Sequence, residues 1–115
     1  MLPTQWSDNI GQWASGHPQI VSIYAFGSRV TGLSRQGGGV RPDSDLDLAI
    51  AVQGHSASNA LSEFFSYRKQ WADEIGLLLN IVVEINYLGP EAGHVMRYVR
   101  EGGQHIYGNK LQALT

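Results

Sequence analysis

The sequence predicts a small α/β (α+β) protein in which helices flank a short mixed β-sheet. Segments rich in β-branched and aromatic residues, which are typical of buried strands, alternate along the chain with segments whose apolar residues recur at helical spacing. The chain has 115 residues, about the length of one domain, so we expect a single domain over residues 1–115.

The first predicted elements are a helix over residues 4–15 and a strand over residues 19–26. The strand is rich in β-branched and aromatic side chains, and the Gly-Ser pair after it turns the chain into a short helix that ends near Leu33. The first helix is indicated by apolar side chains that fall four and three positions apart and would share one face, namely Trp6, Ile10 and Trp13.

The middle of the chain predicts a second strand over residues 45–52 and a long helix over residues 57–75. The strand alternates aliphatic side chains with aspartates and alanines, so its two faces differ. The helix repeats aromatic and aliphatic side chains at helical spacing. Residues 34–42 contain three successive glycines, which lose too much backbone entropy to lie inside a helix or strand, and therefore indicate a loop.

The last third of the chain predicts a strand over residues 80–88, a helix from Pro90 to about Arg100, and a short extended segment over residues 104–108. Pro90 suits the first turn of a helix, and the glycine pair after Glu101 stops it. Helices and strands thus alternate along the whole chain, which implies helices packed on a small mixed sheet.

The composition excludes several classes of protein. Because there is no cysteine, a disulfide scaffold and a thiolate metal site are excluded, and a cytoplasmic location is favoured. The most apolar segment is broken by Asn80 and Glu84 well short of a membrane span, so we expect no association with a membrane. A net charge of −2 gives no general attraction to nucleic acid, so any bound phosphate must be held locally.

Two aspartates in the second predicted strand form a candidate metal site. Because strand side chains alternate with a rise of about 3.3 Å per residue, Asp45 and Asp47 project from one face with their Cα atoms roughly 6–7 Å apart. Carboxylates at that separation can clamp a divalent cation, and such hard oxygen ligands select Mg²⁺ or Mn²⁺ over zinc. The alternative is that both are solvated at the start of the strand, although an unpaired carboxylate within an apolar strand is unfavourable.

A third acid, Glu84, lies inside the aliphatic strand over residues 80–88. If this strand is the neighbour of the one over residues 45–52, Glu84 can face the same spot as the two aspartates. Three carboxylates around divalent cations form the arrangement that two-metal nucleotidyl transfer needs. The alternative is a glutamate on an edge strand that points to water.

The Gly27-Ser28-Arg29 segment that follows the first strand is a candidate phosphate site. Gly27 allows a tight turn and a close approach of the backbone to a phosphate, and Ser28 offers a hydroxyl and an amide at the start of a helix. Arg29 can reach a phosphate or pair with an aspartate. A Gly-Ser pair after a strand is often only a turn, and its position just before an acidic strand is what favours phosphate binding.

Taken together, these motifs resemble a known family. "GSRVTG" followed by "SDLDLAI" is similar to the Gly-Ser, Gly and Ser-Asp-x-Asp-Leu signature of the polymerase-beta-like nucleotidyltransferase superfamily, and the small size resembles its minimal nucleotidyltransferase (MNT) branch. The tail "VMRYVREGGQHIYG" also resembles the end of those minimal domains. The likeness covers residues 19–108, which would form the catalytic core of a nucleotidyltransferase fold.

The resemblance implies the transfer of a nucleoside monophosphate, AMP from ATP, to a hydroxyl acceptor with release of pyrophosphate. It also implies a cofactor of two Mg²⁺ ions, with Mn²⁺ as the alternative metal. The catalytic and metal-binding residues that it implies are Asp45, Asp47 and Glu84. The nucleotide-binding residues that we expect are Gly27 and Ser28, on the β- and γ-phosphates, together with Arg29 and Ser44.

The chain departs from the family pattern in two places. The third acid, which is usually aspartate, is Glu84, whose side chain is one methylene longer. The segment before Ser44 is lengthened by an insertion over residues 34–40, a loop that would lie beside the phosphate site and could gate it.

By the same resemblance the expected partner is a HEPN-domain protein, because many minimal members act as antitoxins that modify such a protein, in several cases by adding AMP. Two alternatives remain open. The chain could be an antitoxin-type binding subunit with weak or vestigial catalysis, or it could transfer the nucleotide to a small molecule such as an aminoglycoside. The base preference, and whether the chain forms a homodimer, also remain open.

Overall fold

The computed structural model describes residues 1–31, 45–53 and 57–110. Four helices and four strands lie in this part of the chain, and they are, in order, α1 (Thr4–Ser15), β1 (Ile20–Phe26), α2 (Ser28–Thr31), β2 (Leu46–Val52), α3 (Ala57–Leu79), β3 (Val83–Tyr87), α4 (Gly93–Gly102) and β4 (Gln104–Gly108). The predicted α/β class, with helices flanking a mixed sheet, is confirmed.

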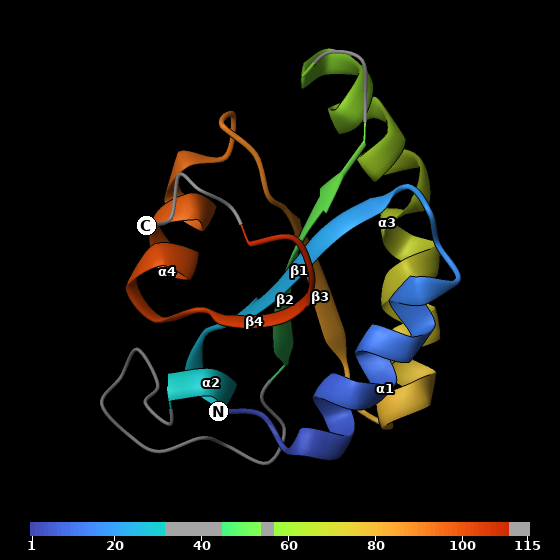
Figure 1. Ribbon diagram of the computed structural model, residues 1–115, viewed down its shortest axis with the longest axis vertical. Coiled ribbons are helices and arrows are strands. Elements are labelled where there is room, and N and C mark those ends of the chain that lie inside the picture. The colour runs from blue at the N-terminus through green and yellow to red at the C-terminus, as the bar shows by residue number, and fades with distance from the viewer. Residues whose placement is uncertain (32–44, 54–56, 111–115) are drawn as a thin grey trace.

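The strands form a single sheet in the order β3-β2-β1-β4 (Figure 1). Strand β1 runs antiparallel to both of its neighbours, whereas β2 and β3 are parallel. Parallel neighbours need a long crossover connection, and α3 supplies it. The two acid-bearing strands are therefore neighbours, which is the condition for Glu84 to share a face with the two aspartates.

The sheet separates two hydrophobic cores. On one face, α1 and α3 pack against the sheet, and Phe64 and Trp71 of α3 are each only 1% exposed. On the other face, α4 packs through Val95 and Val99. Figure 1 shows α4 on the opposite side of the strands from α1 and α3.

Strand β2 shows the predicted alternation, and this alternation decides where its acids point. Leu46, Leu48 and Ile50 are buried in the core on the α3 side, whereas Ala49 belongs to the core on the α4 side. Because side chains two residues apart share a face, Asp47 lies on the same face as Ala49. The acidic positions of this strand therefore face the α4 side of the sheet.

Several predicted boundaries differ from the structure. The strand predicted over residues 80–88 is shorter and covers Val83–Tyr87. The long helix continues past residue 75 to Leu79. The last helix begins at Gly93 rather than at Pro90, because residues 89–92 form a turn closed by a bond from the Ala92 amide to the Gly89 carbonyl, 3.0 Å long. The extended segment 104–108 is a full strand, β4, paired with β1. The loop predicted over residues 34–42 lies outside the described residues.

Among the helices that the structure describes, none has the combination of length and apolar character that crossing a membrane requires.

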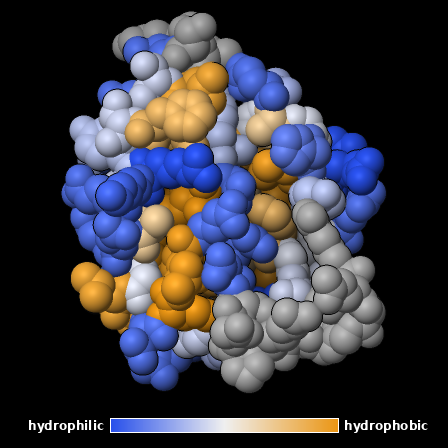
Figure 2. All heavy atoms as spheres, turned by 180° about the vertical axis from the view of Figure 1, so that it is seen from behind, coloured by the Kyte–Doolittle hydropathy of each residue, from blue (hydrophilic) through white to orange (hydrophobic). Residues whose placement is uncertain are grey.

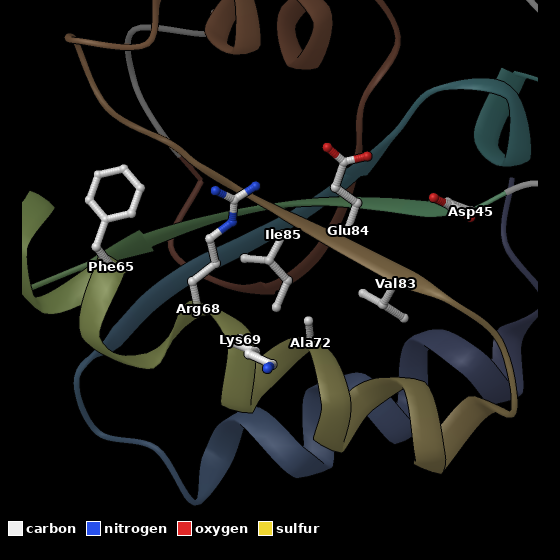
Figure 3. A pocket seen from close by; sticks show the side chains of 8 residues that line it. All are labelled: Asp45, Phe65, Arg68, Lys69, Ala72, Val83, Glu84 and Ile85. Carbon is white, nitrogen blue, oxygen red and sulfur yellow. The ribbon is translucent and has the colours of Figure 1, made fainter.

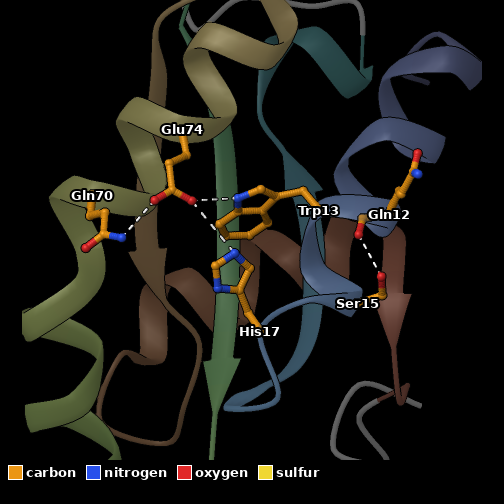
Figure 4. Close-up of polar contacts among 6 residues, drawn as sticks. All are labelled: Gln12, Trp13, Ser15, His17, Gln70 and Glu74. Carbon is orange, nitrogen blue, oxygen red and sulfur yellow. Dashed lines mark hydrogen bonds and ion pairs between the residues drawn. The ribbon is translucent and has the colours of Figure 1, made fainter.

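A polar cluster joins α1 to α3 at the edge of the first core (Figure 4). The carboxylate of Glu74 accepts a hydrogen bond from the indole of Trp13, 2.9 Å long, and one from the amide of Gln70, 2.8 Å long. The Nε2 atom of His17 lies 3.7 Å from the same carboxylate. These bonds from Gln70 and Trp13, with the charge of His17, lower the pKa of Glu74. Ionised Glu74 therefore helps to hold the first helix against the third.

Replacing Glu74 by glutamine is expected to destabilise the protein at neutral pH and to matter less in acid. The pKa of Glu74 is lower in the folded state than in the unfolded state, where it is about 4.5, so its stabilising contribution is complete above that pH and is lost as the pH falls through the folded-state pKa. Urea unfolding of the wild type and Glu74→Gln at neutral pH and near pH 3 measures the effect. A difference in the free energy of unfolding that is the same at both pH values would contradict this account.

Candidate active site

The Gly-Ser bend lies directly against an aspartate of the neighbouring strand. Gly27 follows the last residue of β1 and has a φ of +85°, in the left-handed region that favours glycine. A Cβ atom built on Gly27 would lie 2.6 Å from the Oδ2 atom of Asp47, a contact that real side chains do not make. The backbone of the bend can therefore lie this close to the carboxylate only because residue 27 is glycine.

Beyond the bend, the chain enters the short helix α2. The amides of Val30 and Thr31 both donate to the carbonyl of Gly27, each at 3.1 Å, and Ser28 is half-buried at the first position of the helix. The guanidinium of Arg29 lies 5.7 Å from the ring centre of Trp6 in α1. Ser28 thus directly follows the residue that contacts Asp47, and Arg29 lies toward the first helix.

The strand register brings the acids of β2 and β3 to one face. Phe26 pairs with Asp47 across the antiparallel strands β1 and β2, and Asp47 pairs in turn with Glu84 across the parallel strands β2 and β3. Paired residues of adjacent strands point to the same side, and Asp45 shares that side because it precedes Asp47 by two positions. All three predicted carboxylates therefore lie on the α4 face of the sheet.

The carboxylates are spread over this face rather than gathered at a point. Asp47 is half-buried, whereas Asp45 and Glu84 are exposed. Over residues 1–31, 45–53 and 57–110, no three histidine, aspartate or glutamate side chains are close enough together to hold a metal ion. The strand register thus puts the three acids on one face of the sheet. Their carboxylates, however, do not converge on one cation site as the sequence predicted.

An open hollow of about 430 Å³ lies beside the acidic face, between α3 and β3 (Figure 3). In Figure 3 the carboxylate of Glu84 points away from α3, whereas Val83 and Ile85 point toward that helix. The hollow is lined by Asp45, Phe65, Arg68, Lys69, Ala72, Val83, Glu84 and Ile85.

Sequence reasoning assigned no site role to the basic residues of this hollow. Arg68 and Lys69 lie on α3, three and four positions after Phe65, so a single helix face presents all three. The signal available was a cationic pair within an otherwise apolar helical pattern. The nucleotide-binding residue proposed at Ser44 and the insertion over 34–40 lie outside the described residues.

Comparison with known proteins agrees with this arrangement. The family described as polymerase beta, nucleotidyltransferase matches residues 8–112, which is nearly the whole chain. The chain belongs to the polymerase beta nucleotidyltransferase family. Membership of this family makes it a nucleotidyltransferase. A search of curated proteins finds no match.

Several solved structures share the fold of this nucleotidyltransferase. A toxin–antitoxin structure with AMP-PNP matches with a TM-score of 0.66 and 20% identity over 90% of this chain and 74% of that one. A toxin–antitoxin MntA-HepT structure matches with a TM-score of 0.63 and 17% identity over 93% and 74% of the two chains. A tri-AMPylated Shewanella oneidensis HEPN toxin in complex with an MNT antitoxin matches with a TM-score of 0.60 and 18% identity, over 91% and 71%. At these identities the likeness establishes the fold.

Replacing Gly27 by alanine is expected to destabilise the nucleotidyltransferase by about 1–2 kcal/mol, because the new Cβ atom meets both the left-handed backbone conformation and the carboxylate of Asp47. Urea unfolding measures the change. The matched control is Gly93→Ala in α4, where a Cβ atom meets nothing within 4 Å and stability should change by less than about 0.5 kcal/mol. Equal effects of the two substitutions would show that the bend tolerates a side chain.

Proposed function

We propose that this nucleotidyltransferase transfers AMP from ATP to a hydroxyl group of a partner protein. One observation carries the proposal. The bend at Gly27 touches Asp47, and Asp47 pairs directly with Glu84, so a phosphate-binding turn and an acidic face are joined through one residue of β2. A triphosphate on the amides and hydroxyl of Gly27 and Ser28 would lie against that face.

The residues of this face fit a divalent cation in their chemistry. Their carboxylates are hard oxygen donors, which suit Mg²⁺ or Mn²⁺. We propose that two Mg²⁺ ions are held by Asp45, Asp47 and Glu84, whose side chains are exposed or half-buried and share one face of the sheet. Bound there, the ions would supply positive charge that offsets the charge of the triphosphate and of the leaving pyrophosphate.

The proposed reaction exchanges one phosphorus–oxygen bond for another. The acceptor hydroxyl oxygen forms a bond to the α-phosphorus of ATP, and the bond from that phosphorus to the bridging oxygen of pyrophosphate breaks. The hydroxyl proton passes to a carboxylate, for which we propose Glu84, since this residue is exposed and projects from the acidic face. Asp45 and Asp47 would orient the triphosphate, and Gly27 lets it approach.

The similar structures support the proposed donor and partner. One of them contains AMP-PNP, an ATP analogue, and another contains a tri-AMPylated HEPN toxin with its MNT antitoxin. On this basis we propose ATP as the donor and a HEPN-domain protein as the acceptor. The nucleotide would be transferred to the partner's own hydroxyl group.

A second candidate function is binding without appreciable turnover. The observation that favours it is the spread of the acids, because no three of the described carboxylates and histidines gather into a metal-binding cluster. In that case the chain would neutralise its HEPN partner by covering it, and the acidic face would be vestigial. The two candidate functions differ in whether Asp45 and Asp47 are needed for activity.

Replacing Asp45 or Asp47 by alanine is expected to lower nucleotide transfer by at least about 100-fold, because each removes a ligand that no other group replaces. The assay follows transfer of label from α-labelled ATP with Mg²⁺ to a candidate HEPN-domain partner. Asp73→Asn, a change at an exposed acid of α3 outside the hollow, is the control and should leave transfer unchanged. A tight complex with no transfer by the wild type would instead support the binding function.

Replacing Glu84 by glutamine tests its role as the proton acceptor. Glutamine keeps the size of the side chain but cannot accept the proton, so the expected loss in kcat is about 100-fold to 10,000-fold. Glu84→Asp keeps the carboxylate and should retain more activity than Glu84→Gln. If Glu84→Gln and Glu84→Asp lose activity equally, the length of the side chain matters rather than proton transfer.

A further inference from the structure

The hollow beside Glu84 runs along the outer edge of the sheet. Val83, Glu84 and Ile85 all line it, although successive strand side chains point to opposite faces. One hollow can contact three consecutive residues of a strand only if it lies alongside the strand rather than over one face. In the described sheet β3 is an outer strand, with β2 as its neighbour, so the hollow follows an open strand edge.

The main chain of this edge is directed outward at alternate residues. The amide of Leu46 donates to the carbonyl of Val82 at 2.9 Å, and the amide of Leu88 donates to the carbonyl of Ile50 at 3.0 Å. These bonds show that the even-numbered residues of this region bond to β2. The amides and carbonyls of Val83, Ile85 and Tyr87 therefore point away from β2, as a row of groups on which a further strand could pair.

One face of α3 forms the wall of the hollow opposite the strand edge. Phe65, Arg68, Lys69 and Ala72 lie on it at helical spacing, and the side chain of Phe65 is 59% exposed. In the part of the chain that the structure describes, neither Arg68 nor Lys69 has an acidic group within the 4 Å of an ion pair. The wall thus offers an aromatic ring and two cations without anionic partners.

Two exposed apolar side chains also lie in the hollow or next to a residue that lines it. Phe65 lines the hollow and is 59% exposed, and Val82, which precedes Val83 of the lining, is 66% exposed. Figure 2, which shows the molecule from behind, shows several hydrophobic patches with hydrophilic groups between and around them. An extended chain that pairs with β3 would therefore meet apolar as well as basic side chains.

We propose that this hollow is the docking site for an extended, acidic segment of the protein acceptor, which adds as a strand to the open edge of β3. The strand edge supplies main-chain hydrogen bonds, Arg68 and Lys69 attract the carboxylates of the segment, and Phe65 covers an apolar side chain. Glu84 belongs both to the hollow and to the acidic face, so a hydroxyl on the docked segment would lie beside the proposed proton acceptor. This inference rests on the proposed function and names how its acceptor is held.

The position of the hollow favours a peptide over the phosphates of the nucleotide. The bend that would hold the phosphates lies at the end of β1, where it contacts Asp47 of β2. Strand β2 separates β1 from β3, the strand that borders the hollow. Asp45 and Glu84 lie on the sheet side of the hollow, whereas Arg68 and Lys69 lie on its α3 side. An acidic peptide can place its carboxylates at Arg68 and Lys69 while its main chain pairs with β3.

A binding experiment without nucleotide tests the docking site separately from catalysis. The probe is a fluorescein-labelled nine-residue peptide in which glutamate and valine alternate around a central tyrosine, and fluorescence anisotropy measures its Kd. Arg68→Glu and Lys69→Glu are each expected to weaken binding by about tenfold or more. Arg100→Glu, at an exposed arginine of α4 outside the hollow, is the matched control and should leave the Kd unchanged.

Two further probes test the mode of binding. A peptide that is N-methylated at alternate amides, and so cannot pair with a strand edge, should bind at least about tenfold more weakly than the parent peptide. Inorganic tripolyphosphate should not displace the parent peptide, since the phosphates belong at the bend. Arg68→Gln, a milder change, repeats the test if Arg68→Glu does not fold, and urea unfolding checks each variant.

The outcomes separate the docking site from the proposed function. No binding of the parent peptide, equal binding by Arg68→Glu and the wild type, or displacement by tripolyphosphate would each overturn the docking site, even where nucleotide transfer is observed. Binding that depends on Arg68 and on free peptide amides supports it, even where the wild type transfers no label. Peptide binding without label transfer would overturn the proposed catalysis and support the docking site.

Discussion

The contact between Gly27 and Asp47 is the constraint on which the rest of the site depends. It exists because Phe26 pairs with Asp47 across β1 and β2, which brings the end of one strand to the start of the next. The same aspartate pairs with Glu84 across β2 and β3. One position of β2 thus fixes both the place of the bend and the place of the third acid. A shift of one residue in either register would turn an acid to the opposite face of the sheet, into the core beneath α3.

Most of the fold was predictable because its strands have clearly different faces. In the segments over residues 45–52 and 80–88, one set of alternate positions is aliphatic, and the structure buries this set against α3. The boundaries of the helices were less predictable. Pro90 fits the first turn of a helix, but it fits the turn over residues 89–92 equally well, and local sequence does not distinguish the two.

The shared face of the three proposed acids was predictable, whereas the spacing of their carboxylates was not. Alternation and strand adjacency correctly brought Asp45, Asp47 and Glu84 to one face. How far apart their carboxylates lie depends on side-chain rotation and on exposure, which a sequence pattern does not encode. The hollow beside Glu84 depends on how α3 packs along β3, so Arg68 appeared in the sequence only as one more residue of a long helix.

The open edge of β3 also bears on how the isolated chain behaves in solution. Beside it, Phe65 is 59% exposed and Val82 is 66% exposed, so apolar surface borders main-chain groups that are able to pair. Edges of this kind join to any extended chain, including another copy of the same protein. Produced alone, the protein should self-associate as its concentration rises, whereas a partner bound along β3 would keep it monodisperse.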